Sequence, residues 1–257
     1  MEKAVIVGPY HFIGIHLCSA LLEKGIDIMG ISYPQVQINK LEDKKMVFGR
    51  NANFMEKDWG YLVCADVEVI IFDLYTLDRK NELVLTLLSA YKEAALIKEM
   101  TKKKIVIICP ITIEKKIMEE SISLFELHQQ AYQIIYLPTI YGPWQPEIFL
   151  FQQILADKRK TIKKHEMEYT EDAIYIDDAI TEIVNQIVQG KEREVVLKSN
   201  VENHWNKCKN SLDWKQDTKE TSICCFSDSV STIIVKNKNN ISENLEIQRK
   251  HIMMYID

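Results

Sequence analysis

The stretch VIVGPYHFIGIHL, residues 5–17, joins a short apolar run to a helical pattern through two glycines. Its first three residues predict a buried strand that runs into Gly8. Gly14 opens an amphipathic helix, predicted over residues 13–24 from the spacing of its apolar side chains. His11 stands midway between the two glycines. This order predicts a strand, a tight turn and a helix, the unit with which an α/β fold begins.

Beyond this stretch, short runs rich in Val and Ile alternate with longer helical patterns. Such alternation predicts βαβ units in a parallel sheet, and the handedness of their crossovers makes the fold a doubly wound, Rossmann-type α/β fold. Further strands are predicted at DIMGIS, VEVIIFDL, KIVIICP, QIIYLP and EVVLKS. Helices are predicted over residues 81–100 and 114–130, from AIYIDD to about residue 190, and over residues 241–255 with Ser242 as its N-cap.

The chain divides by composition into a larger and a smaller part. Residues 1–190 carry the alternating pattern and are predicted to form a Rossmann-type nucleotide-binding domain, with an insertion at about residues 142–170. From residue 191 the chain turns polar and irregular. Residues 191–257 are therefore predicted to form a small, reduced C-terminal region on the substrate side.

Bulk composition excludes several classes of function. The 257 residues carry a net charge of −5 with a pI near 5.8, which argues against nucleic acid or an anionic membrane as the main partner. No apolar run approaches the roughly 20 residues needed to span a bilayer, and MEKAVIVG is no signal peptide. Neither the six cysteines nor the histidines show metal-ligand spacing. The sequence predicts a cytoplasmic protein without a metal.

Four stretches together resemble the extended short-chain dehydrogenase/reductase family, in its NAD-dependent epimerase/dehydratase branch. VIVGPYHFIGIHLCSALLEKGIDIMGIS resembles the first strand, glycine turn, helix and second strand of that family. YLPTIYGP, YIDDAITEIV and ISENLEIQRKHIMMY resemble three later segments, in the family's order and over nearly the full chain. The resemblance implies a Rossmann-type fold, a dinucleotide cofactor and a nucleotide-sugar substrate.

The glycine turn departs from the family at its middle position. The family has three glycines, of which the first makes the turn, the middle one lets backbone approach the pyrophosphate, and the last lets helix pack on strand. Here His11 replaces the middle one, and a left-handed His11 would add roughly 1–2 kcal/mol of strain. The helix N-terminus still offers N–H groups to an anion. Whether NAD or NADP binds therefore stays open, with expected contacts at Gly8, His11, Phe12, Ile13 and Gly14.

A second departure follows the second strand, where the family places an acidic residue on the adenosine ribose. This chain has Ser32 there, which offers a single hydroxyl in place of a carboxylate. The resemblance puts Asp58 and Trp59 beside the adenine, although Asp58 is equally well explained as a helix N-cap. NAD would therefore be held more weakly than in the family.

Three further residues are expected to line the cofactor channel through the same resemblance. Leu74 and Tyr75 follow the strand VEVIIFD, where the family has small residues, and Pro138 ends the strand YLP. Tyr75 is bulky, so it would narrow the channel.

The third departure concerns catalysis. The family uses a Tyr and a Lys four residues apart on one helix, because the ammonium lowers the pKa of the phenol so that it can act as a base. CPITIEKKIMEESISLFELHQQAY, residues 109–132, contains no such pair. The remaining candidates for catalysis are Thr112, Lys116 and Tyr141.

Two functions follow from these departures, and the sequence leaves both open. The first is a degenerate relative that no longer catalyses the family reaction and binds a nucleotide or nucleotide sugar, or acts as a regulatory or interaction protein. The second is an active NAD(P)-dependent epimerase, dehydratase or reductase whose base is a displaced tyrosine, such as Tyr75, Tyr91 or Tyr141. The helices over residues 81–100 and 114–130 match the pair through which the family dimerises, which predicts a homodimer.

Overall fold

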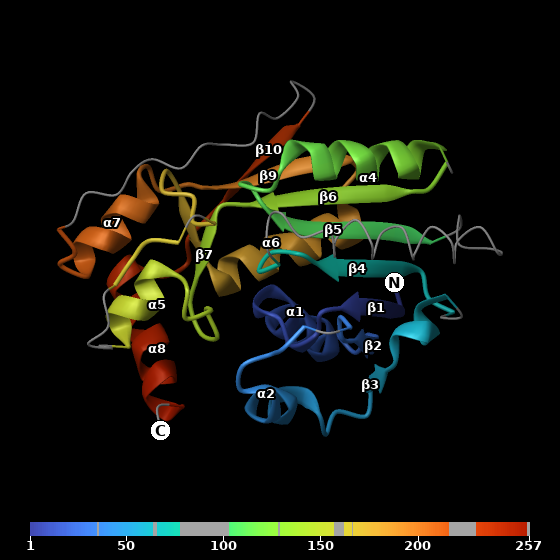
Figure 1. Ribbon diagram of the computed structural model, residues 1–257, viewed down its shortest axis with the longest axis horizontal. Helices are drawn as coiled ribbons and strands as arrows, with labels where there is room; N and C mark the ends of the chain where they lie inside the picture. Colours follow the sequence, from blue (N-terminus) through green and yellow to red (C-terminus); the bar gives the residue numbers. More distant parts are fainter. Residues whose placement is uncertain are drawn as a thin grey trace.

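The computed structural model describes residues 1–34, 36–63, 66–77, 103–127, 129–156, 162–165, 167–215 and 230–255. Within these ranges, eight strands form one sheet in the order β10-β9-β6-β5-β4-β1-β2-β3 (Figure 1). Every neighbouring pair is parallel. The strands are β1 (Lys3–Val7), β2 (Asp27–Ile31), β3 (Phe54–Lys57), β4 (Val69–Asp73), β5 (Lys104–Pro110), β6 (Tyr132–Leu137), β9 (Glu194–Ser199) and β10 (Ser231–Val235).

The first six strands have the order 3-2-1-4-5-6, which is that of the Rossmann fold, and the predicted doubly wound parallel sheet is thereby confirmed. Successive strands are added toward one edge from β1 to β3 and toward the other edge from β4 to β6, so the switch point lies between β1 and β4, where ligands of such sheets bind. A second, two-stranded parallel sheet pairs β7 (Thr139–Tyr141) with β8 (Ala173–Tyr175).

Helices cover both faces of the main sheet (Figure 1). α1 packs against α6 over one face, and α4 lies over the other. Strand side chains alternate between the faces, so Ile6 and Ile108 belong to the core on the α1 side, while Val5 and Ile107 belong to the core on the α4 side. The helices are α1 (Phe12–Glu23), α2 (Leu41–Phe48), the 3-10 helix η1 (Trp59–Val63), α4 (Lys115–Leu127), α5 (Leu150–Leu155), α6 (Ile176–Gln189), α7 (His204–Ser211) and α8 (Ile241–Met254).

The segment from residue 191 onward contributes both to the sheet and to a helical group beside it. β9 and β10 extend the main sheet beyond β6. α8 packs against both α5 and α7, and the three helices lie together at one end of the molecule (Figure 1). The division of the chain at residue 190 stays a prediction, and the predicted helix over residues 81–100 lies outside the described ranges.

The predicted N-cap of the last helix is wrong. The N-cap residue of α8 is Asn240, whose side chain accepts a hydrogen bond from the Glu243 amide at 2.9 Å. Glu243 in turn accepts from the Asn240 amide, so the two residues form a capping box. Ser242 is the second residue of the helix and is exposed.

In the described part of the chain, no helix is both long enough and apolar enough to span a bilayer.

Candidate functional site: the glycine turn and an adjoining cavity

The turn between β1 and α1 requires glycine at two positions. Gly8 has φ +90° and donates from its amide to the Ile31 carbonyl at 2.9 Å, which ties the turn to the end of β2. A Cβ on Gly14 would lie 1.9 Å from the Gly8 carbonyl oxygen. Backbone contact within the turn therefore excludes a side chain at Gly14, whether or not a ligand binds.

His11 occupies the middle position of the turn without backbone strain. Its φ of −73° and ψ of 170° are those of extended backbone, so the left-handed conformation considered above does not occur. The side chain is 7% exposed, with Nδ1 3.1 Å from the Thr76 hydroxyl and the ring edge-on to Tyr33. Burial, and secondarily the charge of Lys44, lowers the pKa of His11 to about 4. Its imidazole is neutral at pH 7, and Nε2 has no hydrogen-bond partner among the described residues.

The N-terminus of α1 holds a carboxyl group from β4. Asp73 ends that strand and is completely buried. Its Oδ2 accepts from the Gly14 amide at 2.7 Å, and its Oδ1 accepts from the Tyr75 amide at 3.0 Å. Burial raises the pKa of Asp73 to about 7, against the lowering effect of backbone N–H groups of Gly14, Tyr75 and Ile13. The first turn of α1 is thus already capped by an acidic side chain, at the end of a helix that attracts anions.

Asp73 is not among the residues that the sequence predicted for the site. It is the single acidic residue at the end of the apolar run VIIFD, and an acid at the carboxyl end of a central strand is a signal that could have been used.

Tyr33 lies across the turn. The ring comes so close to Gly8 that a Cβ there would lie 2.9 Å from Tyr33 Cε2. The hydroxyl donates to the Asp73 carbonyl at 3.1 Å, and burial raises the pKa of this phenol well above its usual value. The residues predicted to face the ribose and adenine lie differently: Ser32 and Asp58 are exposed, and Trp59 is half-buried against the Tyr33 ring.

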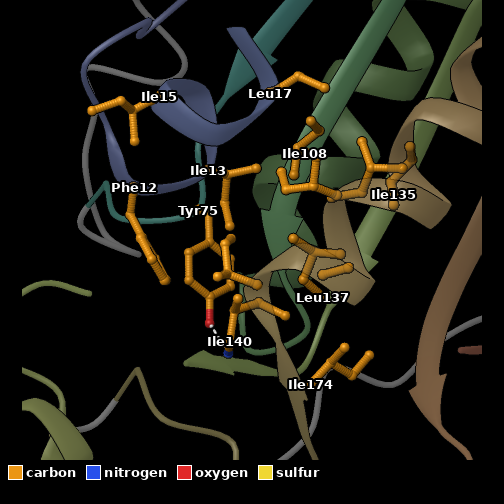
Figure 2. Close-up of a cluster of buried hydrophobic side chains, with 14 of the residues drawn as sticks. Phe12, Ile13, Ile15, Leu17, Tyr75, Ile108, Ile135, Leu137, Ile140 and Ile174 are labelled. Atoms are coloured by element: carbon orange, nitrogen blue, oxygen red, sulfur yellow. Dashed lines mark hydrogen bonds between the residues drawn. The ribbon is translucent and has the colours of Figure 1, made fainter. Parts of the chain in front are cut away.

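Tyr75 fills the space between α1 and the end of β6 (Figure 2). Its ring stands beside Phe12 and Ile13, and it is 2% exposed. The hydroxyl donates to the Pro138 carbonyl at 2.9 Å and accepts from the Ile140 amide at 2.8 Å. The proton of this phenol is therefore engaged by backbone, and burial raises its pKa. Leu74, beside it in the chain, is buried in the core on the α4 side.

The three candidates for catalysis have separate surroundings. Thr112 donates to the Met167 carbonyl at 3.1 Å and is buried. The Lys116 side chain is 81% exposed and lies 3.9 Å from Glu120, one helical turn away. Tyr141 is buried, with its hydroxyl 3.3 Å from His204 Nε2. Their partners differ, so these interactions do not bring the three together in the described structure, and Tyr91 lies outside the described residues.

A cavity of about 540 Å³ opens beside the turn. Its walls come from the turn and the end of β4, from the segment leading into α2, from the segment that follows β7, and from the end of α8. Of the residues predicted to bind cofactor, His11 and Phe12 line it. The lining residues that bear on its chemistry are Lys40, Lys44, Trp144, Glu147, His251 and Tyr255. Within the described ranges, no group of three or more His, Cys, Asp or Glu side chains could hold a metal ion.

A parallel sheet in Rossmann order, with a glycine turn at its switch point, is the architecture of the Rossmann fold. No protein-family model matches the sequence, and no curated protein matches it. Solved structures do resemble it in fold. The UDP-glucuronic acid 4-epimerase of Bacillus cereus, solved with UDP-glucuronic acid and NAD, has a TM-score of 0.70 at 17% identity, over 99% of this chain and 100% of that one.

Two dehydratases are similar to the same extent. The dTDP-glucose 4,6-dehydratase of Bacillus anthracis, in complex with NAD, has a TM-score of 0.71 at 13% identity, over 99% of this chain and 97% of that one. An NAD-dependent NDP-hexosamine 5,6-dehydratase of tunicamycin biosynthesis has a TM-score of 0.66 at 15% identity, over 100% of this chain and 99% of that one. The chain has the fold of the NAD-dependent epimerases and dehydratases of the extended short-chain dehydrogenase/reductase family, which confirms the resemblance at the level of fold.

Proposed function

We propose that this chain is a binding protein built on the epimerase/dehydratase fold, that its ligand is a nucleotide or a nucleotide sugar, and that it does not carry out the hydride chemistry of that group. The observation that carries the proposal is the hydrogen bond from the Gly14 amide to the Asp73 carboxylate.

A dinucleotide places its pyrophosphate at the N-terminus of the first helix, where backbone N–H groups meet its negative charge. In this chain, the Gly14 amide at that helix end donates to Asp73. A pyrophosphate brought to the same point would compete for donors with the carboxyl group and, once Asp73 is ionised, would be repelled by it in a buried, low-dielectric place.

Two tyrosines add to this incompatibility. Tyr33 covers Gly8 from the side of β2, and Tyr75 fills the space between α1 and Pro138. The residues present around the turn, packed as they are, do not fit NAD or NADP. The absence of the family's Tyr and Lys pair from residues 109–132 supports the same conclusion for catalysis.

The nucleotide or nucleotide-sugar ligand is supported by the fold and by the cavity. The similar Bacillus cereus epimerase was solved with UDP-glucuronic acid as well as NAD. The cavity of this chain, at about 540 Å³, lies within the range of small-molecule sites.

The test is titration calorimetry of the purified protein with NAD⁺, NADH, NADP⁺, NADPH and UDP-glucuronic acid. We expect no dinucleotide to bind with a Kd tighter than about 1 mM, and UDP-glucuronic acid to be recovered unchanged after prolonged incubation with NAD⁺. Asp73→Gly is the matched variant, because it frees the N–H groups of α1, and we expect it to gain affinity for the dinucleotides. Micromolar binding of NAD by the unaltered protein, or conversion of the sugar, would overturn the proposal.

We place this protein in the cytoplasm as a homodimer. The buried thiols Cys18 and Cys208, which form no disulfide, are consistent with a reducing compartment. Of the two helices predicted for the dimer interface, α4 is described and residues 81–100 are not. Sedimentation at two protein concentrations tests the dimer, and a monomer at both would exclude it.

A further inference from the structure

Two lysines line the cavity beside the turn. Lys40 precedes α2, and Lys44 follows one turn into it. Neither ammonium forms an ion pair with a described carboxylate. The acidic residue of the cavity lining, Glu147, is exposed.

Each of the two ammonium groups donates one hydrogen bond within the described structure and has further N–H donors for a ligand. An ammonium has three N–H donors. The Lys40 Nζ donates to the Tyr255 carbonyl, and the Lys44 Nζ donates to the Tyr10 carbonyl at 3.0 Å. Burial lowers the pKa of Lys44 to about 8, so the group is still mostly charged at pH 7 and an anion beside it would favour that charge.

One wall of the cavity is aromatic. The Trp144 ring centre lies 4.5 Å from that of His251 and 4.6 Å from that of Tyr255. The Lys44 Nζ lies 5.8 Å from the centre of the Trp144 ring, so the charged and aromatic parts of the cavity adjoin. Trp144 is half-buried, which leaves part of its surface open to a ligand.

Two ring nitrogens of lining residues also lack partners. His11 Nε2 and His251 Nε2 are buried and make no hydrogen bond to any described residue. Buried polar atoms in native proteins are nearly always paired, with protein, water or ligand. Both atoms are shielded from solvent, so they mark unpaired polar groups behind the cavity wall rather than contacts for a ligand.

We propose that this cavity binds a phosphorylated small molecule with a planar ring, with its phosphate held by Lys40 and Lys44 and its ring against Trp144. The inference rests on the proposed function, since it names the site at which a nucleotide would bind. It places the phosphate at the two lysines rather than at the Gly14 amide, which is bonded to Asp73.

The probe is UDP, titrated into the full chain in a calorimeter. Uridine, which has the ring without a phosphate, and inorganic phosphate, which has no ring, are titrated separately for comparison. We expect UDP to bind at least ten times more tightly than either of these. The variants Lys40→Gln and Lys44→Gln should each weaken UDP at least ten-fold. Lys250→Gln removes an equal charge from an exposed position on α8, beside His251 but off the cavity lining, and should leave the affinity unchanged.

Thermal unfolding of each variant verifies that it is folded. If Lys44→Gln is not folded, Lys40→Gln still tests the site, because Lys40 is exposed. If UDP binds equally well to both lysine variants, the cavity is not its site, although the proposed function stands. If UDP does not bind the unaltered protein at all, the inference fails. If inorganic phosphate binds as tightly as UDP, the ring is not recognised and the aromatic part of the inference fails. Failure of the proposed function is seen separately, as binding of NAD or conversion of the sugar.

Discussion

The Gly14 amide nitrogen and the Asp73 carboxylate oxygen lie 2.7 Å apart, so the first turn of α1 is capped by the last residue of β4. This contact depends on the sheet. β1 and β4 are neighbours in parallel register, with Val7 opposite Phe72, so the residue after Phe72 emerges beside the turn that follows Val7. The place that a Rossmann fold offers to a pyrophosphate therefore holds a carboxyl group of the protein itself.

The buried carboxyl group predicts a pH-dependent difference in stability between the protein and Asp73→Asn. Folding raises the pKa of Asp73 from its usual 3.8 to about 7. Its contribution to the free energy of unfolding is therefore fully present below pH 4 and is lost as the pH rises through 7. We expect the stability of the unaltered protein minus that of Asp73→Asn to fall between pH 5 and pH 7, by on the order of 1 kcal/mol per pH unit at its steepest.

Urea unfolding of both proteins at pH 5, 6, 7 and 8 measures this difference. The subtraction removes the titration of groups that do not interact with Asp73, among them His11, whose pKa is set by burial and Lys44. A difference that is constant or rises with pH would show that the folded protein does not favour the protonated carboxyl.

Tyr75→Phe distinguishes a structural phenol from a displaced catalytic base. The substitution removes the hydroxyl that joins the Pro138 carbonyl to the Ile140 amide, and leaves both groups buried without a partner. We expect a loss of about 2 kcal/mol in the free energy of unfolding. Tyr61→Phe is the control, since Tyr61 is 43% exposed and should change stability by less than about 0.5 kcal/mol. An equal effect of the two substitutions in denaturant unfolding would contradict the assigned role of Tyr75.

Gly14→Ala tests whether the last glycine of the turn serves the fold or a ligand. The added Cβ would meet the Gly8 carbonyl oxygen at 1.9 Å, so the helix must move away from the turn. We expect a loss of about 3 kcal/mol or more, seen as a lowered midpoint of thermal unfolding without any ligand present. Gly60→Ala, where a Cβ would meet nothing within 4 Å, should have little effect. A stable Gly14→Ala protein would mean that the backbone contact is relieved easily.

His11→Gly restores the glycine pattern of the family and is expected not to restore cofactor binding. The substitution removes the contacts of the imidazole with Thr76 and Tyr33 and should cost about 1–3 kcal/mol of stability. Asp73 and Tyr33 still occupy the turn, so calorimetry should detect no binding of NAD. The double variant His11→Gly/Asp73→Gly should bind NAD more tightly than His11→Gly does. NAD binding by His11→Gly alone would make the imidazole, and not Asp73, the obstacle.

The sequence predicted the central strands of the sheet because these are buried and read as continuous apolar runs. The edge strands β3 and β10 were not predicted, since both are partly exposed and short. β4 and β5 lie within the predicted segments, whereas β6 and α1 each begin one residue before their predicted starts. α2 and α7 were not predicted, because both are short and polar and owe their stability to packing rather than to periodicity. The N-cap of α8 was misplaced by two residues, since Asn240 and Ser242 are both suitable caps and only the geometry of Glu243 distinguishes them.

The sequence by itself determined the architecture of this protein, because hydrophobic period and glycine spacing are local properties that βαβ units translate directly into a doubly wound sheet. It also identified the missing middle glycine and the missing Tyr and Lys pair. Only the tertiary structure decided what occupies the turn. Asp73 is 59 residues from Gly14 and Tyr33 is 40 from Asp73. Such side chains meet only when parallel strands bring their carboxyl ends to one edge of the sheet.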